Sequence, residues 1–79
     1  MTVTTEQILE IIRKADIPEI DADTLQSDVT FRDQGIDSLD AMSIYLNVEE
    51  TFGFKIPDED IEGLNSVAAL AAYASRAAA

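Results

Sequence analysis

Apolar residues near the start of the chain recur at the i, i+3, i+4, i+7 spacing of a helix with one buried face. They are Ile8, Leu9, Ile11, Ile12 and Ala15. Thr4 and Gln7 have the spacing of a capping box, and Pro18 ends the pattern. The sequence therefore predicts a helix over residues 4–16.

The middle of the chain carries a second helical pattern, from about Ser38 to Thr51. Gly53 suits the end of this helix, and either Asp37 or Ser38 suits its N-cap. At about 100° per residue, two apolar groups form on its surface. The wider group predicts the core face and consists of Ala41, Ile44, Tyr45, Val48 and Phe52. The other group shares an arc with Ser38 and consists of Leu39, Met42 and Leu46.

Two further helices are predicted near the end of the chain. The acidic run at 58–60 opens a short helix that contains Ile61 and closes at Gly63, and residues 65–66 cap a last helix. The core positions of that last helix are Val67, Leu70, Ala71 and Ala74.

Between the first two helices, residues 16–37 show no sustained periodicity and form a long loop. We expect this loop to contain a turn of helix and to be pinned by its isolated apolar residues, because long structureless loops are uncommon in compact domains. The pattern as a whole predicts an all-α fold: a small four-helix bundle with three longer helices and a short third one. Its 79 residues suffice for one domain, residues 1–79.

Charge and composition exclude several classes of function. Sixteen acidic residues against five basic ones give a net charge of −11, so we expect no nucleic-acid partner and a monomer attracted to basic protein surfaces. The chain has no cysteine and no histidine, so disulfides, thiolate chemistry and a Ser–His pair are absent, and we expect no metal site. With no signal-peptide pattern and no apolar run near the ~20 residues of a membrane span, we expect a cytoplasmic protein.

The candidate chemistry lies at Ser38, where the long loop becomes a helix. A phosphate ester on this hydroxyl would sit at the positive end of the helix dipole, beside unpaired N–H groups. The simpler interpretation is that Ser38 only caps the helix.

The segment Gly35-Ile36-Asp37-Ser38-Leu39-Asp40 resembles the phosphopantetheine attachment motif of acyl carrier proteins. The likeness continues through residues 48–53 and 56–60, and it covers nearly the whole chain. This resemblance implies that a phosphopantetheinyl transferase attaches 4'-phosphopantetheine to Ser38. It also implies that the protein is a carrier of acyl or polyketide intermediates and not an enzyme.

The resemblance and the second apolar group together predict a docking surface for acyl-loading, condensing and modifying enzymes. We expect Leu39, Met42 and Leu46 to touch these partners, unless the long loop buries them. The charged and bordering residues expected around them are Asp37, Asp40, Glu49, Glu50, Ile56 and Ile61. Ser43 departs from the family, because carriers for fatty acid synthesis commonly have glutamate there.

Two other functions remain open from the sequence. One is an aminoacyl or peptidyl carrier, which an aspartate directly before the serine disfavours. The other is an acidic helical adaptor that binds a basic partner without any covalent group, with Ser38 only a cap.

Overall fold

The computed structural model describes residues 2–77 and contains helices without any strand in that range. The helices are α1 (Thr5–Ala15), α2 (Ser38–Phe52), α3 (Asp58–Ile61) and α4 (Val67–Ala77), with two 3₁₀ turns, η1 (Ala22–Thr24) and η2 (Arg32–Gln34), in the loop before α2. The all-α prediction is confirmed, with a short third helix and a long loop between the first two helices. The loop holds two helical turns where the sequence predicted one.

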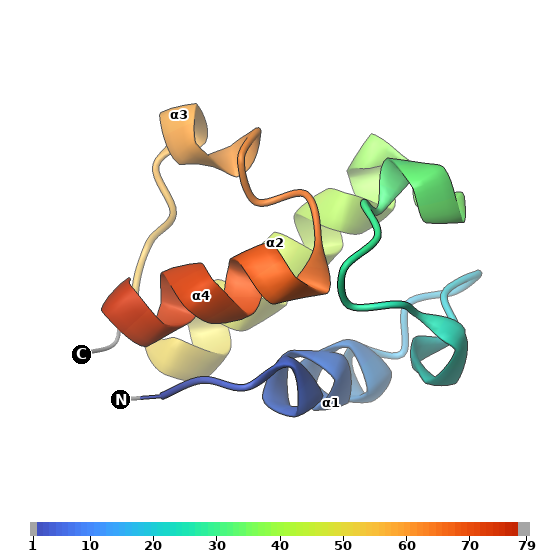
Figure 1. Cartoon of the computed structure of the whole chain (residues 1–79), viewed down its shortest axis with the longest axis horizontal. Coiled ribbons are helices and arrows are strands. Elements are labelled where there is room, and N and C mark those ends of the chain that lie inside the picture. The colour runs from blue at the N-terminus through green and yellow to red at the C-terminus, as the bar shows by residue number, and fades with distance from the viewer. Residues whose placement is uncertain (1, 78–79) are drawn as a thin grey trace.

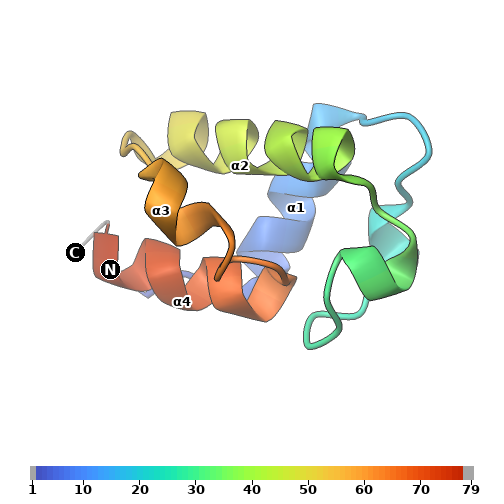
Figure 2. The same ribbon diagram turned by 90° about the horizontal axis from the view of Figure 1, so that it is seen from above.

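Helices α1, α2 and α4 form the body of the molecule, and α1 packs against both of the others. Figures 1 and 2 show that α2 and α4 run in roughly the same direction, whereas α1 runs in the opposite sense and crosses both of them obliquely. The short α3 lies over the gap between α2 and α4, on the side away from α1. The molecule measures 31 × 24 × 20 Å along its principal axes.

The start of α1 is fixed by the predicted capping box. Thr4 Oγ1 accepts a hydrogen bond from the N–H of Gln7, and the Gln7 side chain accepts one from the N–H of Thr4. At the other end Asp16 adopts a left-handed conformation with φ 50°, and its N–H donates to the carbonyl of Arg13. These local bonds satisfy backbone groups that the helix itself cannot pair.

The core is built from the helical faces that the periodicity predicts. Its largest fully buried side chains are Ile8, Ile12, Ile44, Val48, Val67 and Leu70. Tyr45 is also buried, its hydroxyl donates to the carbonyl of Leu64 at 2.9 Å, and its ring meets Phe31 edge-on. The prediction that Tyr45 is a core aromatic is confirmed.

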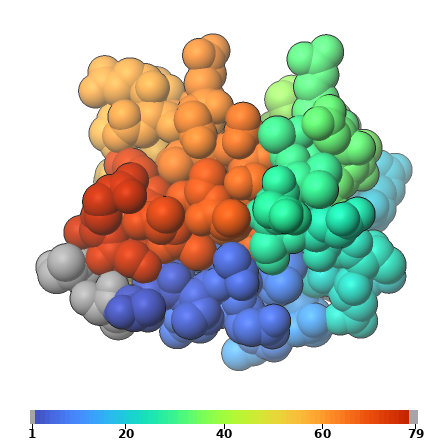
Figure 3. Space-filling view, in the orientation of Figure 1, coloured from blue at the N-terminus to red at the C-terminus, as the bar shows by residue number. Residues whose placement is uncertain are grey.

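The second half of the loop before α2 is anchored by hydrogen bonds to the start of α4 and within the loop itself. The N–H of Phe31 donates to the carbonyl of Asn65 at 2.8 Å, and the N–H of Ala68 donates to the carbonyl of Ser27 at 2.8 Å. Figure 3 shows the two segments in contact, the loop in green and the start of α4 in orange. The Gln34 amide closes the loop from inside, bonding to both backbone groups of Gln26.

The first residues of the chain are tied to α4. The N–H of Val3 donates to Ser75 Oγ at 2.8 Å, and Ser75 Oγ lies 3.2 Å from the carbonyl of Val3. Val3 is itself buried, so this link combines hydrogen bonds with apolar packing.

Candidate functional site

Ser38 is the first residue of α2, and its neighbour Asp37 is the N-cap of that helix. Asp37 Oδ1 accepts a hydrogen bond from the N–H of Asp40 at 2.9 Å. Ser38 is exposed, and no hydrogen bond to its hydroxyl is found among residues 2–77. The interpretation that Ser38 is merely the cap is therefore wrong, because Asp37 already fills that role.

A tight turn presents Ser38 at this place. Gly35 adopts φ 83°, a left-handed conformation that glycine tolerates without strain from a side chain. The N–H of Ile36 then donates to the carbonyl of Phe31 at 2.9 Å, and the Ile36 side chain is buried. An anchored residue therefore stands two positions before the exposed serine.

A surface cavity of about 420 Å³ opens beside Ser38. Its lining combines an apolar floor with a few polar groups, and consists of Phe31, Arg32, Ile36, Asp37, Ser38, Ala41, Tyr45 and Asn65. The N–H groups in the first turn of α2 and the helix dipole favour an anion on the Ser38 oxygen. A free hydroxyl with space around it at a helix N-terminus fits a phosphodiester such as that of 4'-phosphopantetheine.

The second apolar group of α2 faces outward. Leu39 is 79% exposed, Met42 41% and Leu46 52%. These are large values for side chains of this size, so the alternative that the long loop buries them is wrong. The three residues line the same side of α2 as Ser38.

The acidic residues predicted around this group differ in their surroundings. Asp37 and Glu50 are exposed, whereas Asp40 and Glu49 are half-buried. Glu49 Oε2 accepts a hydrogen bond from the N–H of Ile56 at 2.6 Å. One oxygen of this carboxylate therefore stabilises the fold. This contact could not be predicted from the sequence, because it joins α2 to the segment before α3.

The two isoleucines named with the docking surface lie in different places. Ile61 in α3 is half-buried and packs against the core. Ile56 is only 6% exposed and belongs to the core itself. The expectation that the Ile56 side chain borders the docking surface is wrong, because this side chain lies in the core although the residues that follow it in the sequence are acidic.

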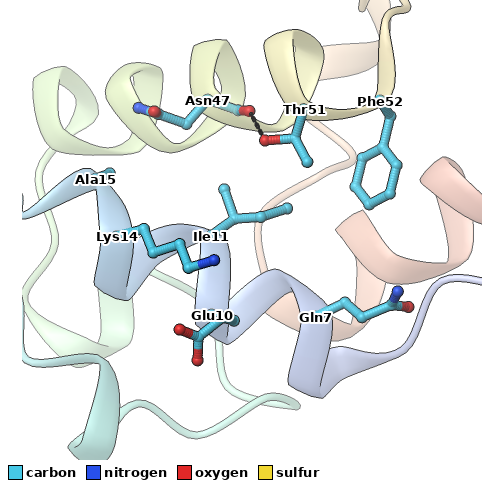
Figure 4. Close-up of a pocket in the computed structure, with 8 residues that line it drawn as sticks. All are labelled: Gln7, Glu10, Ile11, Lys14, Ala15, Asn47, Thr51 and Phe52. Atoms are coloured by element: carbon cyan, nitrogen blue, oxygen red, sulfur yellow. Dashed lines mark hydrogen bonds between the residues drawn. The ribbon is translucent and has the colours of Figure 1, made fainter.

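A second cavity, of about 410 Å³, lies between α1 and α2 on a different flank of α2 (Figure 4). Ile11 and Phe52 supply its apolar surface, and Lys14, Asn47 and Thr51 are among its polar residues. It contains no residue of the segment around Ser38. Within residues 2–77, no cluster of three or more acidic side chains is arranged to hold a metal ion.

Burial raises the pKa of the Tyr45 phenol above its ordinary value. Tyr45 lines the floor of the cavity beside Ser38, with its hydroxyl turned to the Leu64 carbonyl. A phenol held in its neutral form and committed to a backbone bond is not a base for the serine.

Comparison with known proteins shows which family the chain belongs to. The family model described as "Phosphopantetheine attachment site" matches residues 6–74. An acyl carrier protein of Kineococcus radiotolerans is 45% identical over 56 residues, which cover 70% of this chain and 69% of that protein. A mitochondrial acyl carrier protein of Dictyostelium discoideum is 33% identical over 69 residues, which cover 87% of this chain.

The matched stretch spans 56% of the length of the Dictyostelium protein. No helix within the described residues is long and apolar enough to cross a bilayer. The family match runs from α1 to the last turns of α4, and it includes the whole environment of Ser38. The chain therefore belongs to the acyl carrier protein family and contains its phosphopantetheine attachment domain.

Proposed function

We propose that Ser38 is the residue that receives 4'-phosphopantetheine, and that the protein delivers acyl or polyketide intermediates to enzymes of fatty acid, polyketide or related biosynthesis. The observation that carries this proposal is the exposed Ser38 hydroxyl, free of hydrogen bonds within the described chain, at the first position of α2. Asp37 supports it by capping the helix and leaving the hydroxyl available.

The attached group supplies a terminal thiol, which holds the cargo as a thioester and replaces the cysteine that this chain lacks. The chain has no histidine near Ser38 to take its proton, so the modifying transferase must provide the base. What the chain contributes is position: the first turn of α2 holds the oxygen at the surface and stabilises negative charge on the ester.

We further propose that the outward face of α2 is where partner enzymes dock. Leu39, Met42 and Leu46 form a small exposed apolar group next to Ser38. Carboxylates around it would pair with Lys or Arg on a partner; they are Asp37, Asp40, Glu49 and Glu50. Such a surface favours fast encounter and fast release, because the charges steer approach while little apolar area is buried.

Attachment is tested by intact mass. Incubation with coenzyme A and a broad-specificity phosphopantetheinyl transferase should raise the mass by one phosphopantetheine. Ser38→Ala should abolish the gain, whereas Ser43→Ala, on the same helix, should keep it. A full gain of mass in a folded Ser38→Ala variant would show that the arm is attached to another residue. No gain in the unmodified protein would favour the noncovalent adaptor.

Docking is tested by adding a charge to the apolar group. Met42→Glu should lower the rate of transfer to a cognate partner by tenfold or more, because an uncompensated charge would be buried in the complex at a cost of at least ~1.4 kcal/mol. Ala72→Glu, at an exposed position of α4, is the matched control and should leave transfer unchanged. Equal transfer rates for the two variants would show that Met42 is not part of the docking surface.

The cellular location, the oligomeric state and the absence of catalysis by this protein are also proposed. We propose a monomer in the cytoplasm that performs no reaction by itself, although one relative is named as mitochondrial. Fractionation of the native cell distinguishes the two locations, and light scattering measures the oligomeric state. Turnover of an acyl substrate by the purified protein alone would contradict the carrier assignment.

A further inference from the structure

Arg32 is the basic residue that lines the cavity beside Ser38. The other four basic residues are placed differently. Arg13 pairs with Glu10 and Asp23, Arg76 stacks over Tyr73, Lys14 lines the cavity between α1 and α2, and Lys55 lines a groove at the far end of α2. Arg32 is exposed and takes part in no ion pair among residues 2–77, so its charge is uncommitted.

The charges close to Ser38 in the chain are otherwise negative. Asp33, Asp37 and Asp40 lie within five positions of the serine, and Asp37 shares the cavity with it. A phosphodiester on Ser38 adds a further negative charge to this region. The helix dipole offsets only part of that repulsion, because its effect is limited to about half a charge.

The backbone of Arg32 is held firmly. The N–H of Gly35 donates to its carbonyl at 3.0 Å and closes the η2 turn, while Phe31, directly before it, is tied to Asn65. The Gln34 amide fixes the other end of the turn to the loop. A side chain on such a turn is presented to the cavity without the cost of ordering its backbone.

We propose that Arg32 binds the phosphate of the arm and directs the first part of the arm over this cavity when no partner is docked. This inference rests on Ser38 being the attachment residue. A guanidinium offers paired N–H donors that match two phosphate oxygens. In the arm, the phosphate ester is followed by a methylene and then by a carbon with two methyl groups, and Phe31, Ile36 and Ala41 give the cavity an apolar lining that suits these methyl groups.

Phosphorus NMR of the loaded protein tests the proposal, because the diester contributes a single phosphorus signal. Intact mass first establishes that each sample carries the arm. Arg32→Gln should then shift the phosphorus resonance, and Arg32→Lys should shift it less. The matched control is Arg76→Gln, which removes the same charge at the end of α4 and should leave the resonance in place.

The arginine itself provides a second measurement. The Nε–Hε signal of Arg32 should move when the unloaded protein is converted to the loaded form, and about 1 M salt, where the Debye length is roughly 3 Å, should reverse the movement. Full loading with no change at Arg32, or with the same phosphorus shift in Arg32→Gln and Arg76→Gln, overturns the inference and leaves the carrier function intact. Failure of Ser38 to load would instead refute the proposed attachment site.

Discussion

Two adjacent residues at the start of α2 have separate roles. Asp37 accepts the hydrogen bond that caps the helix, and Ser38 presents a hydroxyl to solvent. Both residue types are good caps, so the sequence alone could not decide between them. The turn at Gly35 determines which residue is the N-cap. It brings Asp37, with extended backbone, into the N-cap position and places Ser38 inside the helix.

Tyr45 offers a test of how the core is held under the cavity. Tyr45→Phe keeps the ring but removes the donor to the Leu64 carbonyl, and should cost about 1–2 kcal/mol in the free energy of unfolding measured in urea. Tyr73→Phe, which loses a bond to the half-buried Asp60 carboxylate, should cost less. Equal costs would contradict the assignment of Tyr45 Oη to a buried bond.

The burial of Tyr45 also predicts that the stability of the folded protein depends on pH in the alkaline range. Burial raises the pKa of Tyr45 in the folded state, so folding favours the neutral phenol. This contribution is fully present below the unfolded pKa of 10.0 and is lost as the pH rises through the folded value. Urea titrations from pH 8 upward should therefore show stability falling above about pH 10, and less steeply in Tyr45→Phe.

Residues whose partners are close in sequence were predictable, and residues with distant partners were not. The Thr4–Gln7 capping box involves atoms three positions apart and was read from spacing alone. Ile56 is buried, and its N–H donates a hydrogen bond to Glu49, seven positions earlier on another element. No periodicity in the sequence records such a contact.

Among the elements, α3 depends most on its neighbours. Four residues are too few for an independent helix. It is held by Tyr73 Oη donating to Asp60 at 3.0 Å, by the Glu49 carboxylate before it and by Tyr45 after it. Glu49, which belongs to α2, therefore links that helix to the segment before α3.

Removing Glu49 should loosen α3 and the segment before it. In Glu49→Ala, amide hydrogen exchange over residues 56–63 should rise about tenfold, since a lost hydrogen bond to a charged group costs on the order of 1.5 kcal/mol. Exchange in α1 should change little. Glu50→Ala is the control, because Glu50 is exposed on the same helix. Identical exchange in both variants would show that Glu49 does not hold α3.

The longer helices and the short third one were predicted at the level of elements, because apolar spacing and caps act within each of them. The loop before α2 was predicted only to contain a helical turn. Its two 3₁₀ turns are stabilised by contacts that span the loop, such as the Gln34 amide with Gln26 and Val29. These contacts need the loop to be folded already, so local preference could not locate them.

At the scale of the whole molecule, the excess of acidic residues is largely uncompensated. Against a net charge of −11, the ion pairs found within residues 2–77 both involve Arg13. Like charges on so small a body repel one another and reduce the stability of the compact state. The high net negative charge therefore lowers the stability of the fold, and it would favour encounter with the basic partners proposed above.

Salt should accordingly stabilise the folded protein. Raising the ionic strength from about 0.01 M to 0.15 M shortens the Debye length from roughly 30 Å to 8 Å, so the thermal midpoint should rise. Each kcal/mol gained corresponds to roughly 4–8 °C for a domain of this size. Replacing Asp58 and Glu59 with their amides should reduce the rise. A midpoint that falls with salt would show that attractive pairs dominate instead.

The link between Val3 and Ser75 has a practical consequence. It brings Val3 and the last turns of α4 together toward one end of the long axis, and the first turn of α2, which begins at Ser38, lies toward the other end (Figures 1 and 2). A dye or a surface anchor can therefore be introduced near Val3 or Ser75, far from the first turn of α2.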